Sequence, residues 1–155
     1  MALEVRRVVT GHDAGGKAIV LIDETARTFE QHAGAEGAVI WTTQSFPVDN
    51  AGSADGAAGA LTWKNGTVFR VVSNAPGATG GMHRTESIDY AVVMSGELDM
   101  ELDGAVVRLR AGDVLVQRGT AHRWVNRGSV PCVLAFVMID ARPVEVAGRV
   151  LGATV

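Results

Sequence analysis

Hydrophobic and polar residues alternate most regularly between positions 97 and 110. Leu98, Met100 and Leu102 occupy every second position, with acidic residues between them. Because successive side chains of a strand point to opposite faces, this pattern predicts a strand with one buried and one solvated face. Asp103-Gly104 predicts a type I′ turn, after which apolar residues alternate with arginines. We therefore expect a β-hairpin whose acidic outer row lies opposite a basic outer row.

Short apolar runs separated by glycines cover most of the remaining chain, and the full chain contains 19 glycines. This pattern is typical of many short antiparallel strands and predicts an all-β sandwich or barrel. Thr25–His32 has mixed helical character, and a loop or a single turn fits it equally well. Asn50–Ala60 consists largely of small residues without periodicity, and we expect either a mobile lid or an inert surface loop. The predicted strands are Arg6–Thr10, Lys17–Ile22, Ala38–Thr43, Thr67–Ser73, Asp89–Met94, Glu97–Leu102, Ala105–Arg110, Asp113–Gln117, His122–Asn126 and Cys132–Ile139.

Composition narrows the class of protein. The 155 residues, 47% apolar and 20% charged, predict one domain over residues 1–155 with a sizeable core. The net charge of −3, without any block of like charge, argues against a nucleic-acid partner. The longest apolar run, Pro131–Ile139, is far shorter than the ~20 residues of a membrane-spanning helix. Cys132 is the single cysteine and the N-terminus lacks the apolar core of a signal peptide, so a cytoplasmic location is expected.

Two of the four histidines lie in glycine-bounded motifs. Gly77-x5-His83 and Asp89-x6-Gly96 form the first, and Gly119-x2-His122-x3-Asn126 forms the second. Together they resemble the signature of the cupin superfamily, Gly-x5-His-x-His-x3/4-Glu-x6-Gly followed by Gly-x5-Pro-x-Gly-x2-His-x3-Asn. The resemblance covers residues 77–126 and implies a double-stranded β-helix (a jelly-roll cupin barrel) with extra N-terminal strands in residues 1–66 and a C-terminal strand in residues 130–140. We expect the N-terminal strands to form a homodimer, which would cover the edge strands of the sheet, and the resemblance implies a dimer as well.

The first motif departs from the family pattern at two ligand positions. Asp89 stands where the family has Glu, and Thr85 stands where it has its second His. The resemblance therefore leaves His83, Asp89 and His122 as metal ligands, a set that suits Zn²⁺, Fe²⁺ or Mn²⁺. In the second motif Arg118 replaces the family's Pro. The alternative is a metal-free pocket in which Asp89 fixes the tautomer of His83.

Other residues near these motifs are candidates for contact with a substrate. Trp124 shares strand parity with His122 and is predicted to face the cavity, where it would stack on a flat substrate or pack at the barrel mouth. Thr85, in the vacant ligand position, is a second contact. Arg70 would suit a substrate carboxylate if it points inward, although an outward, solvated Arg70 fits the sequence equally well. Tyr90 and Gln117 are catalytic candidates, with packing and a structural amide as their respective alternatives.

The resulting functional prediction is a metal-dependent enzyme that acts on a small organic molecule. A divalent ion would act as a Lewis acid on a carbonyl or hydroxyl oxygen, which favours lyase, dehydratase, isomerase or cyclase chemistry. The first alternative is an Fe(II) dioxygenase that uses the same ligands. The second is a non-catalytic module that binds a small ligand without metal.

Overall fold

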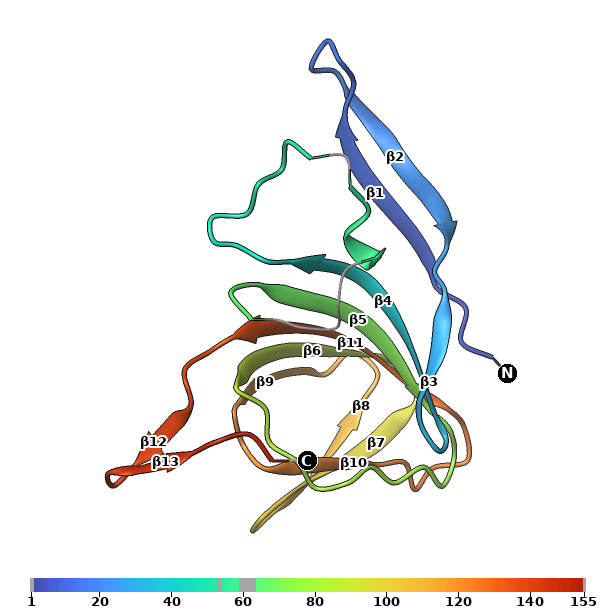
Figure 1. The fold of residues 1–155 in the computed structure, drawn as a ribbon. Helices are drawn as coiled ribbons and strands as arrows, with labels where there is room; N and C mark the ends of the chain where they lie inside the picture. Colours follow the sequence, from blue (N-terminus) through green and yellow to red (C-terminus); the bar gives the residue numbers. More distant parts are fainter. Residues whose placement is uncertain (1, 53, 59–63, 155) are drawn as a thin grey trace.

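The computed structural model describes residues 2–52, 54–58 and 64–154, and nearly all of its regular structure is β-strand (Figure 1). The ten predicted strands are all present, with ends shifted by no more than three residues. One 3₁₀ turn, η1 (Gly56–Ala58), is the helical element of the described chain. The strands are β1 (Arg6–His12), β2 (Ala18–Thr25), β3 (Thr28–His32), β4 (Ala35–Thr43), β5 (Thr67–Asn74), β6 (Ser87–Ser95), β7 (Glu97–Leu102), β8 (Val106–Arg110), β9 (Val114–Arg118), β10 (His122–Val125), β11 (Cys132–Asp140), β12 (Val144–Val146) and β13 (Arg149–Leu151).

Two antiparallel sheets enclose the core and form a jelly-roll barrel (Figure 1). The larger sheet has the order β3-β4-β5-β11-β6-β9, and the smaller one has the order β10-β7-β8. Leu98 and Met100 of β7 pack in one buried cluster with Val72, Leu134 and other residues of the larger sheet. The alternation that predicted the inner face of β7 is thus confirmed, because two of the three predicted inward residues are buried and the third, Leu102, is partly buried against the same cluster.

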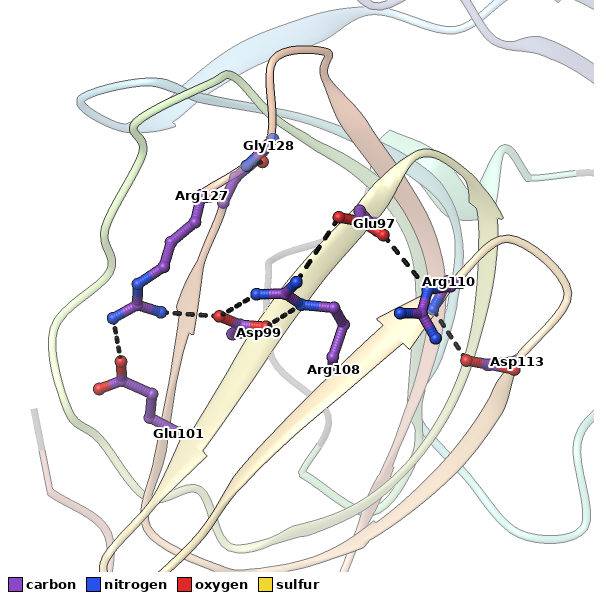
Figure 2. Close-up of polar contacts among 9 residues, drawn as sticks. Glu97, Asp99, Glu101, Arg108, Arg110, Asp113, Arg127 and Gly128 are labelled. Atoms are coloured by element: carbon purple, nitrogen blue, oxygen red, sulfur yellow. Dashed lines mark hydrogen bonds and ion pairs between the residues drawn. The ribbon is translucent and has the colours of Figure 1, made fainter.

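The β7–β8 hairpin has the predicted charge pattern on its outer face (Figure 2). Asp99 lies opposite Arg108 in the register and accepts hydrogen bonds from it and from Arg127. Asp99 is thereby buried, although its row was predicted to be solvated. The turn type was wrong: neither Asp103 nor Gly104 has the positive φ that a type I′ turn requires.

Three strands were missed by the sequence analysis. Residues 28–32 form β3 instead of a loop or helical turn, and Phe29 lies opposite Gly37 of β4. Strands β12 and β13 form a short C-terminal hairpin, and Ala147 and Gly148 at its turn both have positive φ. Residues 28–32 contain one strongly apolar side chain, so they lack an alternation that would have identified the strand.

The N-terminal hairpin β1–β2 extends away from the barrel (Figure 1). Arg7 ties it to the segment before η1 through two hydrogen bonds to Asp55, and Thr42 donates a hydrogen bond to the Gly56 carbonyl. Asp55 and η1 therefore lie near β1 and β4, while residues 53, 59 and 60 of the segment Asn50–Ala60 are outside the described part of the chain. Within that described part, no helix has the length and hydrophobicity to cross a membrane.

Candidate active site

A cavity of about 200 Å³ lies inside the barrel between the two sheets. Alternate residues of β5, β10 and β11 face it, as expected for side chains on one face of each strand. No described residue of the segment Asn50–Ala60 is among its lining residues. The lining residues are Gln31, His32, Arg70, Val72, Asn74, Gly80, Gly81, His83, Thr85, Asp89, His122, Trp124, Phe136 and Met138.

The two sequence motifs meet directly at His83 and His122. Their backbones form a mutual pair of hydrogen bonds, each 2.9 Å long from N to O. The glycine-rich segment before His83 runs antiparallel to β10, with Thr79 bridged to Val125. Gly77 begins this segment with a φ of 79°, a conformation that glycine adopts without strain. The two imidazole rings consequently lie 4.3 Å apart between centroids.

Each imidazole is oriented by a backbone carbonyl. His83 Nδ1 lies 2.9 Å from the Gly81 oxygen, and His122 Nδ1 lies 3.0 Å from the Thr120 oxygen. A carbonyl oxygen only accepts, so each Nδ1 donates, and in the neutral ring the Nε2 lone pair remains available. Burial lowers the pKa of His122 to about 4, so this ring is neutral at physiological pH. His122 therefore presents the form that binds a metal, and the Nε2 of His83 is likewise not engaged by the carbonyl that orients its ring.

Asp89 is a buried carboxylate in the same cavity. It accepts hydrogen bonds from Ser87 Oγ at 2.6 Å and from Gln117 Nε2 at 3.0 Å. Burial raises its pKa above the ordinary value of an aspartate, and the two hydrogen bonds oppose this shift. Asp89 makes no hydrogen bond to His83, so the alternative in which it fixes the tautomer of His83 is not the arrangement found. The Gly81 carbonyl has that position.

The residue types at this site are suitable ligands for a divalent ion, but their side chains are not close enough together in this structure to hold one. Two neutral imidazoles and one carboxylate are suitable ligands for Zn²⁺, Fe²⁺ or Mn²⁺. Over the described ranges, however, no three His, Cys, Asp or Glu side chains are grouped closely enough to hold one ion. The fold brings His83 and His122 together and places Asp89 in their cavity, so the three-ligand set stays a prediction.

Of the other predicted site residues, three line the cavity, one contacts Asp89 and one lies on the surface. Arg70, Thr85 and Trp124 all line the cavity. Gln117 contacts Asp89 without lining the cavity, and its Oε1 is buried without a hydrogen-bond partner. Tyr90, one of the catalytic candidates, lies on the outer face of β6 and is 49% exposed. Its parity is opposite to that of Asp89, which places it away from the cavity.

Two lining residues were not identified from the sequence because β3 was missed. Gln31 and His32 at the end of β3 reach the cavity, and the His32 Nδ1 lies 3.2 Å from the Ala33 oxygen. Residues 25–32 were predicted as a helical segment, a loop or a single turn, and none of these gives the two side chains a direction toward the barrel. Phe136 and Asn74 also line the cavity, and only their strand parity could have indicated it.

Comparison with known proteins was consistent with the fold and the motifs. The family model of the cupin domain matches residues 70–139. Phomopsin biosynthesis cluster protein C′ of Diaporthe leptostromiformis is 36% identical over 94% of this chain and 84% of its own length. The cupin-domain-containing oxidoreductase fogC of Aspergillus ruber is 36% identical over 94% of this chain and 77% of its own. The structure of KdgF from Halomonas sp. is similar with a TM-score of 0.53 at 19% identity, over 72% of this chain and 84% of KdgF, which indicates a shared fold alone.

Proposed function

The chain belongs to the cupin superfamily, and on this premise we propose that it is an enzyme acting on a small organic molecule inside the barrel. The observation that carries the proposal is the cavity, where two oriented imidazoles, a buried carboxylate and a guanidinium meet. Pockets that combine apolar walls with a few convergent polar groups are typical of small-molecule sites. Relatives named as oxidoreductases, fogC among them, support an enzymatic role.

We propose that His83 and His122 hold a divalent metal ion and that Asp89, which is not grouped with them closely enough in the present arrangement, moves to become the third ligand. The orientation of both rings supports this, because each Nδ1 is engaged and each Nε2 is left for a ligand. A carboxylate has about four acceptor sites, so the bonds from Ser87 and Gln117 leave Asp89 able to bind a cation. When bound, such an ion would polarise a carbonyl or hydroxyl oxygen, or, as iron, support redox chemistry.

We place oxidoreductase chemistry first among the predicted reactions because several relatives carry that name. Lyase, dehydratase, isomerase or cyclase chemistry at the same residues is the second candidate, since the same three ligands would equally serve a redox-inert ion acting as a Lewis acid. Iron in the purified protein together with substrate-dependent oxygen uptake would select the first. Zinc without oxygen uptake would select the second.

Metal analysis of protein purified without chelator tests the site. We expect near one equivalent of ion per chain in the wild type and a loss of at least about tenfold in occupancy in both His83→Ala and His122→Ala, since each removes one ligand. His12→Ala is the matched control, because His12 lies on β1 outside the cavity. Full occupancy in both cavity variants would refute the proposed ligands, and an ion-free wild type would favour the non-catalytic module.

We also propose that the chain forms a homodimer through the outer face of its larger sheet. Leu3 and Ala26 cover Ala38 and Val71 on one part of this face. On β6 and β9 the face continues as an uncovered apolar strip with Tyr90 opposite Val116 and Val92 opposite Val114. We define the apolar strip as Tyr90, Val92, Met94, Val114 and Val116, all exposed in the monomer. A second copy of the same strip would cover it through a symmetric interface.

A further inference from the structure

Arg70 is a cation inside the barrel that has no anionic partner in the described part of the protein. It lies on β5, opposite Phe136 of β11, and its side chain lines the cavity. Its Nε is buried without a hydrogen-bond partner, and no described carboxylate lies within ion-pair distance. Asp89, the carboxylate of the same cavity, is hydrogen-bonded to Ser87 and Gln117 instead.

Arg70 is partly buried, and Arg7, the arginine among the buried residues of the described chain, differs from it in having partners. Arg7, which is 3% exposed, forms ion pairs with both Asp55 and Glu24. At Arg70, burial lowers the pKa and the attraction of Asp89 opposes this shift without overcoming it. A buried charge without a partner is costly to the fold. The fold therefore maintains, at the wall of its cavity, a partly buried positive charge that Asp89 offsets only in part, and a bound anion would supply the partner.

Aromatic rings connect Arg70 to the histidine pair. The Arg70 Cζ lies 5.9 Å from the centroid of the Phe136 ring, and the Trp124 ring lies 5.7 Å from that of Phe136. Trp124 in turn contacts His122 at 5.6 Å between centroids, edge to face. A ligand bound to the guanidinium would consequently have its body beside flat apolar surfaces and its far end directed toward the imidazoles.

From this arrangement we infer that the cavity binds a small aromatic or conjugated carboxylate. The carboxylate would pair with the Arg70 guanidinium in a bidentate manner, and the flat body would lie along Phe136 and Trp124. A cavity of about 200 Å³ limits the ligand to a small organic acid. This inference rests on the proposed function, because it names the class of substrate that the barrel enzyme would take.

Calorimetric binding of benzoate, with benzamide as the neutral analogue of the same shape, tests the inference. Wild-type protein is expected to bind benzoate at least about tenfold more tightly than benzamide, the factor that one charged pair of about 1.4 kcal/mol would give. In Arg70→Gln we expect benzoate affinity to fall about 10- to 100-fold while benzamide affinity stays unchanged. Equal affinity for the two compounds in the wild type, or an unchanged preference in Arg70→Gln, would overturn the inference.

A second measurement separates a binding role of Arg70 from a structural one. Without ligand, Arg70→Gln is expected to unfold at the same temperature as the wild type or a higher one, because an unpartnered buried charge has been removed. Arg7→Gln is the matched control and should unfold at a lower temperature, since it leaves Asp55 and Glu24 without their partner. A large loss of thermal stability in Arg70→Gln would assign it a structural role and contradict the inference.

A third measurement separates failure of this inference from failure of the proposed metal site. Benzoate binding is measured with and without prior treatment with EDTA. A benzoate preference that survives EDTA and disappears in Arg70→Gln supports the inference even if the protein holds no metal. A preference that disappears with EDTA and survives in Arg70→Gln assigns the carboxylate to the metal and overturns the role of Arg70.

Discussion

Asn126, at the end of β10, shows how one buried side chain stabilises the rim of the barrel. Its Nδ2 donates hydrogen bonds to the carbonyls of Asn74 and Val130, and its Oδ1 accepts one from the Gly128 amide. Asn126→Ala removes all three and leaves buried backbone groups unpaired, so we expect a loss of about 3 kcal/mol in the free energy of unfolding. Urea denaturation measures it. Asn50→Ala, at an exposed position, should stay within about 0.5 kcal/mol of the wild type.

At the same scale, the sequence identified some of the residues that share the cavity, but not how they are bonded. Motif spacing placed His83, His122 and Asp89 near one another, because it reflects which strands meet. It could not show that Gly81 orients His83, since backbone carbonyls leave no trace in a side-chain pattern. The direction of Arg70 was open for a related reason: Thr67–Ser73 is apolar on both faces, so its alternation does not distinguish inside from outside.

At the scale of the elements, the ion pair between Arg7 and Asp55 connects the hairpin β1–β2 to the segment before η1, and acid should weaken it. Arg7 donates two hydrogen bonds to Asp55, and these lower the pKa of Asp55 to about 2. A carboxyl group with a depressed pKa stabilises the fold above its unfolded pKa of about 4, and this contribution is lost as the pH falls through about 2. Because Asp55 is 40% exposed, solvent screening limits the contribution to about 1 kcal/mol.

Hydrogen exchange of the β1–β2 amides, corrected for the intrinsic pH dependence, measures this loss. Protection should decrease between pH 4 and pH 2 in the wild type, and Asp55→Asn should already be less protected at pH 6 and change less on acidification. Asp103→Asn, at the tip of the β7–β8 hairpin, is the matched control and should behave as the wild type. Protection that is independent of pH in the wild type would show that Arg7 and Asp55 contribute little to holding the hairpin.

The strands also differed in how well the sequence predicted them. Strands with clear alternation or a dense apolar run, such as β7 and β11, were identified from the sequence and were found with nearly the predicted bounds. Strand β3 has one strongly apolar residue and strands β12 and β13 are three residues long, too short to show a pattern, and all three are strands because a neighbouring strand pairs with their backbone. Such pairing depends on tertiary contacts that local composition does not encode.

At the scale of the whole molecule, the uncovered apolar strip predicts a dimer, and the oligomeric state in solution tests this prediction. If two copies pack through Tyr90, Val92, Met94, Val114 and Val116, light scattering after gel filtration should give twice the mass of one chain. Val116→Glu would place a charge in the centre of that interface and should yield monomers with the barrel intact by circular dichroism. Val106→Glu is the matched control, because Val106 is 61% exposed on β8 of the other sheet and its variant should remain dimeric. A monomeric wild type, or a dimer that tolerates Val116→Glu, would show that the strip is not the interface.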